Sequence, residues 1–251
     1  MNKIITKLVC ILILAASCPA FAYEDVDKTE YVGRDTEGGK RWESETEIRQ
    51  KEGDVYILTE KGEGVYSSFD GQISWETKLE FASTKENVLP LKLVKRVFDS
   101  EGSMIRLEKQ DYNPEKNTVT CLHEDIPRNI SRTKKFTFTK DAVNRQLLGL
   151  YTQKMLENGK RLAKIQMVSE EPGVYNVDLR VIKTENVEIN GRQRRAFKLQ
   201  LDPRLGFLNV AKVFFPKAYY WHSASPDFEW LRYEGLEGDI KSSEVEVTVV
   251  D

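Results

Sequence analysis

Cysteine and histidine, the residues that most often build metal and nucleophilic sites, are scarce in this sequence. Its 251 residues include three Cys and two His, and His123 and His222 form no HxxH or HExxH pair. The Gly-x-Ser-x-Gly nucleophile elbow and a glycine-rich phosphate loop are missing too. We therefore expect no catalytic residue, no metal site and no cofactor, and a protein that is not an enzyme.

An excess of charge of either sign is also absent. Lys and Arg together number 38 and Asp and Glu 40, which gives a formal net charge of −2. This balance excludes a nucleic-acid partner held by bulk basic charge. What the sequence does have is apolar material, with 40% hydrophobic residues, 11 Phe, 10 Tyr and 4 Trp. Such a composition indicates a folded chain with a substantial core.

The longest apolar run lies at the N-terminus and is too short to span a bilayer. Lys3 and Lys7 form a positive start, Leu8–Ala16 is apolar, and Ala20–Ala22 offers a small-x-small cleavage site. The pattern predicts a signal peptide over 1–22 that is cleaved after Ala22. We therefore expect a periplasmic protein with a single β-rich domain over 23–251.

An alternative N-terminal signal surrounds Cys18. The stretch Ala15–Cys18 resembles a degraded lipoprotein box, which would leave the protein lipid-anchored through Cys18. Cleavage after Ala22 instead removes Cys10 and Cys18 and leaves Cys121 alone, so no internal disulfide is expected. Cys121 lies in an alternating run and is predicted to be a buried core thiol.

Alternation with period two runs through most of the chain and predicts an antiparallel all-β architecture. Turn signals separate the runs, and Asn190-Gly191 is the strongest of them. The predicted strands are Asp54–Glu60, Gly71–Phe81, Leu89–Phe98, Ser103–Tyr112, Thr118–His123, Arg161–Val168, Val174–Lys183, Arg194–Leu201, Ala218–Ser223, Phe228–Tyr233 and Lys241–Val250. In the last of these, Val245, Val247 and Val249 share the predicted buried face.

One segment breaks this rhythm and predicts a helix at about 140–158. Thr139 and Asp141 are candidate N-caps, and Asn158-Gly159 supplies a C-terminal stop. An apolar stripe at helical spacing follows Val143, Leu147, Leu150 and Tyr151, and Leu148 and Met155 extend it. A helix with so broad an apolar face is expected to lie against a sheet.

Several stretches resemble the exported bacterial proteins of domain-of-unknown-function family 3108. They are Lys135–Asp141, Gln146–Tyr151, the Asn158-Gly159 exit and Tyr220–Gly235, with Trp221, Pro226, Tyr233, Gly235 and Gly238 in similar places. The likeness is a pattern of elements, and the N-terminal part departs from it. It implies a mainly β protein, an antiparallel half-open β-barrel with one central helix, similar to the periplasmic lipoprotein-carrier fold.

Such a fold implies non-catalytic binding of a lipid, an acyl chain or a lipoprotein in the concave sheet. An open curved sheet has an apolar concave face that either its own helix or a ligand must fill. The candidate lining residues are Trp75, Leu79, Phe81, Leu93, Phe98, Leu147, Leu150, Tyr151, Val177, Leu179 and Phe197. The alternative is a structural or protein-interaction module of the envelope in which these residues are simply core.

Two surface features suggest other partners. The basic residues Arg192, Arg194, Arg195, Lys198 and Arg204 surround the Asn190-Gly191 turn and suit either peripheral membrane contact or an exposed hairpin. The stretch from Leu205 to Trp221 is rich in aromatic residues, which suits either a membrane-touching lip or, as we favour, two core strands broken at Pro216.

A glycan hydrolase of the envelope is the third reading. Paired carboxylates cleave glycosidic bonds, and tryptophans bind sugar rings. The candidate acids are Glu43, Glu45, Glu47, Glu170 and Glu171, and the candidate sugar platforms are Trp42, Trp75 and Trp230. Alternating Glu residues are equally typical of the solvated face of a strand, and with 40 acidic residues pairs arise by chance.

Overall fold

The computed structural model describes residues 27–139, 141–170, 172–204, 217–238 and 242–250. Their strands form one 15-stranded sheet in the order β8-β7-β6-β5-β4-β3-β2-β1-β15-β14-β13-β12-β11-β10-β9. Neighbouring strands are antiparallel except β9 and β10, which are parallel. The two end strands, β8 and β9, are not hydrogen-bonded to each other, so the sheet stays open. This confirms the predicted half-open antiparallel β-barrel.

The strands and helices have the following bounds. The first eight strands are β1 Asp27–Arg34, β2 Lys40–Glu52, β3 Val55–Val65, β4 Gln72–Ser83, β5 Val88–Asp99, β6 Met104–Asn113, β7 Thr118–Asp125 and β8 Ile130–Thr137. Then come β9 Ala142–Asn144, the 3-10 turn η1 Arg145–Leu147 and α1 Leu148–Glu157. The last strands are β10 Leu162–Val168, β11 Val174–Ile189, β12 Arg192–Pro203, β13 Ala218–Ser223, β14 Trp230–Leu236 and β15 Glu244–Val250.

Every predicted strand has a counterpart in the sheet, but, apart from the short β9 within the predicted helix, β1, β2 and β8 were not predicted as strands. All three are polar, and β8 is exposed along most of its length. Their side chains therefore carry little of the apolar alternation that marks a strand in a sequence. Pairing with β15 places β1 in the sheet, and pairing with β7 places β8 there.

The predicted helix exists, but it begins later than expected. Residues Ala142–Asn144 form β9 and pair with Gln166–Val168 of β10, so the predicted caps Thr139 and Asp141 lie before a strand. Asn144 caps η1 by accepting a hydrogen bond from the Leu147 backbone N–H. The helix ends at Glu157 with Asn158 as its C-cap, and Gly159 follows with φ of 68°, as the sequence predicts. The N-terminal boundary is wrong because a tertiary strand pairing competes with helix propensity.

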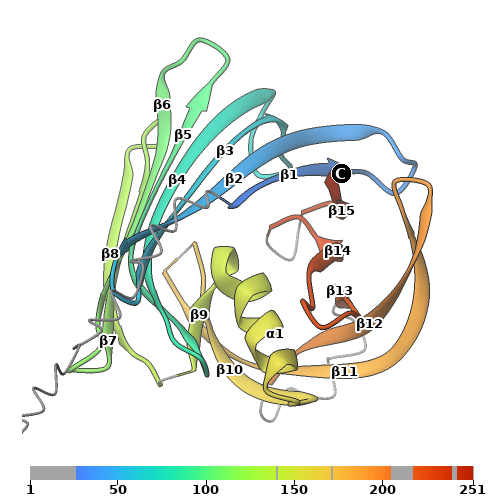
Figure 1. The fold of residues 1–251 in the computed structure, drawn as a ribbon. Helices are drawn as coiled ribbons and strands as arrows, with labels where there is room; N and C mark the ends of the chain where they lie inside the picture. Colours follow the sequence, from blue (N-terminus) through green and yellow to red (C-terminus); the bar gives the residue numbers. More distant parts are fainter. Residues whose placement is uncertain (1–26, 140, 171, 205–216, 239–241, 251) are drawn as a thin grey trace, which may run out of the picture.

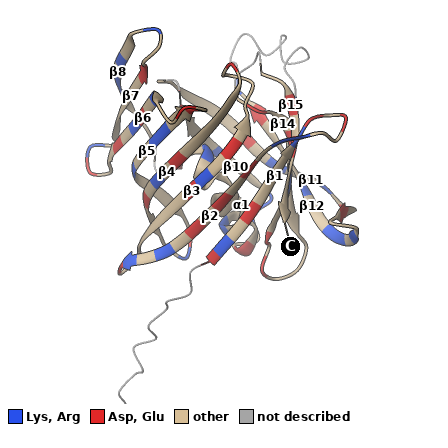
Figure 2. Cartoon of the chain, turned by 90° about the horizontal axis from the view of Figure 1, so that it is seen from above, with Lys and Arg blue, Asp and Glu red and all other residues tan. Residues whose placement is uncertain are grey.

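The sheet curls into an incomplete ring, and α1 lies inside it (Figure 1). The largest core cluster joins α1 to the inner faces of β3, β4, β5, β10, β11 and β12. Beyond it, β6 and β7 pack on Phe138, β9 and β10 through a smaller cluster. In the view of Figure 2, residues of both charge signs are interleaved along the strands.

Candidate functional site

The inner face of strands β3 to β5 carries an apolar row next to the helix. Leu58, Leu79 and Leu93 are cross-strand partners in successive strands, and Ile48 of β2 continues the row. Cross-strand partners share one face of a sheet. Leu79 is 0% exposed, and it belongs to the same cluster as Leu147, Leu148 and Met155. This row is the wall against which α1 packs.

A polar row lies two residues further along each strand on the same inner face. Its members are cross-strand partners through β2, β3, β4, β5, β6 and β7, and they are Thr46, Glu60, Thr77, Lys95, Glu108 and His123. Thr77, Glu108 and His123 are each at most 5% exposed. Buried polar groups cost free energy unless they are paired, so such a row is unusual in a core that only fills space. The interior is therefore amphipathic.

Two buried tryptophans lie beyond the polar row on the same inner face. Trp75 of β4 and Trp42 of β2 meet edge to face with ring centroids 5.9 Å apart. Gly62 lies beneath the Trp75 indole, where a Cβ would come within 2.1 Å of Cζ2 of that ring. Trp42 and Trp75 are 6% and 5% exposed. These tryptophans close one end of the interior.

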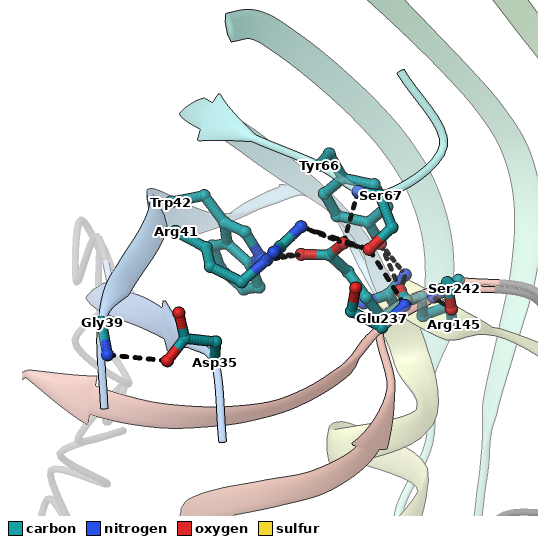
Figure 3. A network of polar contacts seen from close by, with 11 residues as sticks. Asp35, Gly39, Arg41, Trp42, Tyr66, Ser67, Arg145, Glu237 and Ser242 are labelled. Carbon is teal, nitrogen blue, oxygen red and sulfur yellow. Dashed lines mark hydrogen bonds and ion pairs between the residues drawn. The ribbon is translucent and has the colours of Figure 1, made fainter. Parts of the chain in front are cut away.

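The buried carboxylate of Glu237, after β14, organises the polar contacts at this end (Figure 3). Nε1–H of Trp42 donates to Oε1 of Glu237 at 2.8 Å, and Arg41 pairs with the same carboxylate at 3.2 Å. The backbone N–H and the hydroxyl of Ser67 donate to Oε2. Every donor comes from β2 or from the residues after β3, so Glu237 joins the end of β14 to these elements across β15 and β1.

Tyr66 and Arg145 extend these contacts toward the helix (Figure 3). The Tyr66 hydroxyl donates to the backbone oxygen of Glu237 at 2.5 Å and accepts from Nη1 of Arg145. Arg145 also donates to that backbone oxygen at 2.6 Å. Burial raises the pKa of Tyr66, although the Arg145 charge opposes the rise. The phenol therefore stays neutral and keeps its proton.

Lys95, in the polar row, has an acidic partner outside the sheet. Its Nζ lies 2.6 Å from Oε1 of Glu170, in the connection between β10 and β11. Burial alone would raise the pKa of Glu170, but the Lys95 and Arg145 charges outweigh it and lower that pKa to about 2. Burial also opposes the charge on Lys95, yet Glu170 and Glu108 raise its pKa. Both groups are ionised over the whole physiological range.

The predicted lining residues fall into three groups. The largest group lies in the helix-facing core cluster, either buried or packed against it, and comprises Leu79, Phe81, Leu93, Leu147, Leu150, Tyr151, Val177, Leu179 and Phe197. Trp75 shares their face but lies across the polar row, in the cluster with Trp42. Phe98 is half-buried and follows the inward Val97 on β5, which puts it on the outer face. The residues that the pattern missed are the polar ones.

The tryptophans and acidic residues suggested for a glycan hydrolase do not lie as that function would need. Trp42 and Trp75 are buried in the core, so neither offers an open ring to a sugar, and Trp230 is half-buried. Glu43 and Glu45 lie on the exposed face of β2, where they pair with Lys40 and Lys28. Glu171 lies outside the described residues.

The basic residues around Asn190-Gly191 are partly neutralised. Arg192 and Arg195 are exposed, whereas Arg194 pairs with Glu229 at 2.7 Å. The ammonium group of Lys198 lies over the Trp221 ring, 4.3 Å from its centroid, and Arg204 pairs with Asp178. Arg194 and Arg195 border an open depression with Ser223, Ala224 and Ser225. The hairpin itself is as predicted.

Cys121 is a free, buried thiol, as expected. Burial raises its pKa to about 11, so it stays protonated. The predicted signal peptide, Cys18 and the aromatic residues from Leu205 to Pro216 lie outside the described residues. The described end of that aromatic stretch includes Trp221, which is 2% exposed in β13.

Within the described part of the chain, His, Cys, Asp and Glu side chains form no group of three or more that could hold a metal ion. None of the helices described is long and apolar enough to cross a membrane.

The fold places this chain among beta-barrel-like proteins, and one solved structure has a similar fold. A beta-barrel-like protein of domain of unknown function DUF1849 from Brucella abortus is 8% identical, with a TM-score of 0.56 over 89% of this chain and 95% of that chain. At this identity the likeness is one of fold alone.

The other comparisons add less. The hypothetical lipoprotein YmcC from Escherichia coli K12 is 11% identical over 89% of this chain and 86% of its own, with a TM-score of 0.34. No family model matches the chain, and no curated protein matches it. The resemblance to domain-of-unknown-function family 3108 therefore stays a prediction.

Proposed function

We propose that this chain is a non-catalytic protein of the bacterial cell envelope that binds a lipid, an acyl chain or a lipoprotein inside its curved sheet. The observation that supports this proposal is the amphipathic interior. Leu58, Leu79 and Leu93 form an apolar wall, and Thr77 and Lys95 of the polar row lie directly beside it. An amphipathic ligand has matching parts, because its acyl chain needs an apolar wall and its headgroup needs polar partners.

The helix is the element that a ligand has to displace. Helix α1 covers the apolar row, and it reaches the sheet through η1 and leaves it at Gly159. Leu150, on its half-buried side, packs at the margin of the core. An acyl chain that enters beside Leu150 would exchange helix contacts for ligand contacts of similar apolar area, so the net cost of opening stays small.

The decisive experiment is native mass spectrometry with lipid extraction on protein purified from the periplasm without detergent. We expect an added mass in the range of a phospholipid or a fatty acid. The variant Leu150→Trp fills the margin of the core and should lower the bound fraction, whereas Leu162→Trp, at an exposed position of β10, should not. Protein that carries no lipid, and takes none up from anionic or zwitterionic vesicles, would contradict the proposal.

A second candidate is a structural or protein-interaction module whose interior is permanently filled by α1. Leu147 and Leu179 favour it, because both are 0% exposed in the cluster that joins the helix to the sheet. A clean mass of residues 23–251 together with unchanged stability in the presence of fatty acid would favour this candidate. The same spectrum tests the predicted cleavage after Ala22.

A further inference from the structure

We propose that Lys95, Arg106 and Arg145 form a binding site for an oxyanion, a phosphate or a carboxylate, and that Glu170 occupies this site until the ligand displaces it. The inference rests on the proposed function in that the oxyanion would belong to the bound lipid. It uses different atoms from the apolar row, however, and is tested separately.

The three cationic side chains come from three separate elements and converge on neighbouring aromatic rings. Nζ of Lys95 on β5 lies 6.0 Å from the centroid of the Tyr66 ring, and Cζ of Arg145 in η1 lies 5.8 Å from it. Cζ of Arg106 on β6 lies 4.3 Å from the Phe69 ring, whose centroid is 6.4 Å from that of Tyr66. Positive charge is thus concentrated over one small aromatic surface.

Glu170 is the anion that pairs with Lys95, and the charges of Arg145 and Arg106 also act on its carboxylate. Its carboxylate lies 2.6 Å from Lys95, and the charges of Lys95, Arg145 and Arg106 together outweigh burial in lowering its pKa. An environment that favours one carboxylate so strongly also favours the oxyanion of a ligand. Arg106 pairs with Asp125 through Nη2 at 4.0 Å, but its buried Nε has no hydrogen-bond partner among the described residues and can still bind an anion.

Among the acidic residues near these cations, Glu170 is the one whose side chain can move out of the site. Glu108 and Asp125 lie on the paired strands β6 and β7, and Glu237 is 0% exposed with donors on both carboxylate oxygens. Glu170 instead follows β10 in the connection to β11, and its side chain is 28% exposed. Gln110 holds this connection by donating to the backbone oxygen of Ser169 at 3.0 Å. A rotation of the Glu170 side chain toward solvent would vacate the site without breaking a strand pair.

An internal carboxylate competes with an added anion, so removing its charge should expose the site. Inorganic phosphate is the probe, titrated by calorimetry at low ionic strength into wild type and into Glu170→Gln. We expect the apparent Kd for phosphate to fall at least about tenfold in the variant. In wild type, Glu170 occupies the site in most molecules and competes with phosphate, whereas in the variant the site is free. Adding Lys95→Met to Glu170→Gln should abolish the gain.

The matched control is Glu157→Gln, which removes an equal charge from an exposed ion pair with Lys154 on α1. It should leave phosphate binding at the wild-type level. Should Glu170→Gln not fold, Glu170→Asp keeps the charge but withdraws it by one methylene, and a smaller gain of the same sign is expected. The proposal is overturned if no folded Glu170 variant binds phosphate more tightly, or if Glu157→Gln gains as much.

A second arm identifies the source of the oxyanion. Dihexanoyl phosphatidic acid carries a phosphate on two short acyl chains, and Glu170→Gln should bind it at least about tenfold more tightly than phosphate if the ligand is a lipid. Equal affinity would point to free phosphate. That result would agree with the oxyanion site but contradict lipid binding at this site. The experiment therefore distinguishes a failure of one proposal from a failure of the other.

Discussion

Nζ of Lys95 and Oε1 of Glu170 lie 2.6 Å apart and join the inner face of β5 to the connection after β10. The pair connects two parts of the sheet that are far apart in strand order. It also compensates a charge in the middle of the polar row, where an unpaired ammonium group would be costly. The same contact therefore bears on stability and on the proposed oxyanion site.

Acid should weaken the fold through Glu170. Its folded pKa of about 2 is below the ordinary value of 4.5, so its contribution is present above pH 4.5 and is lost as the pH falls toward 2. A shift of this size corresponds to on the order of 3 kcal/mol. Urea midpoints between pH 5 and pH 2 should fall steeply in wild type and less steeply in Glu170→Gln. A variant with the wild-type acid slope would contradict this assignment.

His222 should produce a separate loss of stability at higher pH. It is 0% exposed, its Nδ1–H donates to the Phe228 backbone oxygen at 2.8 Å, and burial lowers its pKa from 6.5 to about 4. The unfolded chain binds the proton first, so stability should fall by on the order of 3 kcal/mol between pH 6.5 and pH 4 and then level off. The variant His222→Gln keeps a donor for Phe228 without titrating. Its urea midpoint should stay flat between pH 6.5 and pH 4.5, above the range in which the contribution of Glu170 is lost.

Gly62 leaves the space that the Trp75 ring fills. A Cβ at this position would lie 2.1 Å from Cζ2 of Trp75, and the contact is with a packed ring rather than a flexible chain end. We expect Gly62→Ala to cost about 1–3 kcal/mol through overpacking and to shift tryptophan fluorescence. Glu63→Ala, at the next position along β3, is the control and should change neither quantity much. Equal unfolding midpoints for the two variants would refute this reading of the contact.

Features that depend on neighbours in sequence were predictable. The Asn190-Gly191 turn has φ of 48° and 76° and joins the partners Ile189 and Arg192, as a two-residue hairpin requires. The inward residues of β15 are buried, with Val245 at 3% and Val249 at 5% exposure. Local chemistry decides both features, so the sequence was enough to predict them.

The polar row was not predictable, because its members meet only through strand register. Thr77, Lys95 and Glu108 lie on three successive strands, and each looks like an ordinary polar residue of an alternating strand. A shift by one residue in any strand would place its member on the other face. Glu170 reaches Lys95 from the connection after β10, a contact that no local pattern signals. The helix start failed for a similar reason, since β9 exists only through its pairing with β10.

A substitution at Leu147 tests whether α1 fills the interior permanently or can be displaced by a ligand. It is 0% exposed in the core cluster, so Leu147→Ala should cost about 3 kcal/mol, and Leu150→Ala, at a half-buried position, about 1 kcal/mol. If α1 exchanges with an acyl chain, oleate should raise the urea midpoint of wild type and raise that of Leu147→Ala more, because a ligand that binds the folded state refills the cavity. Oleate that leaves both midpoints unchanged would mean that the helix fills the interior permanently.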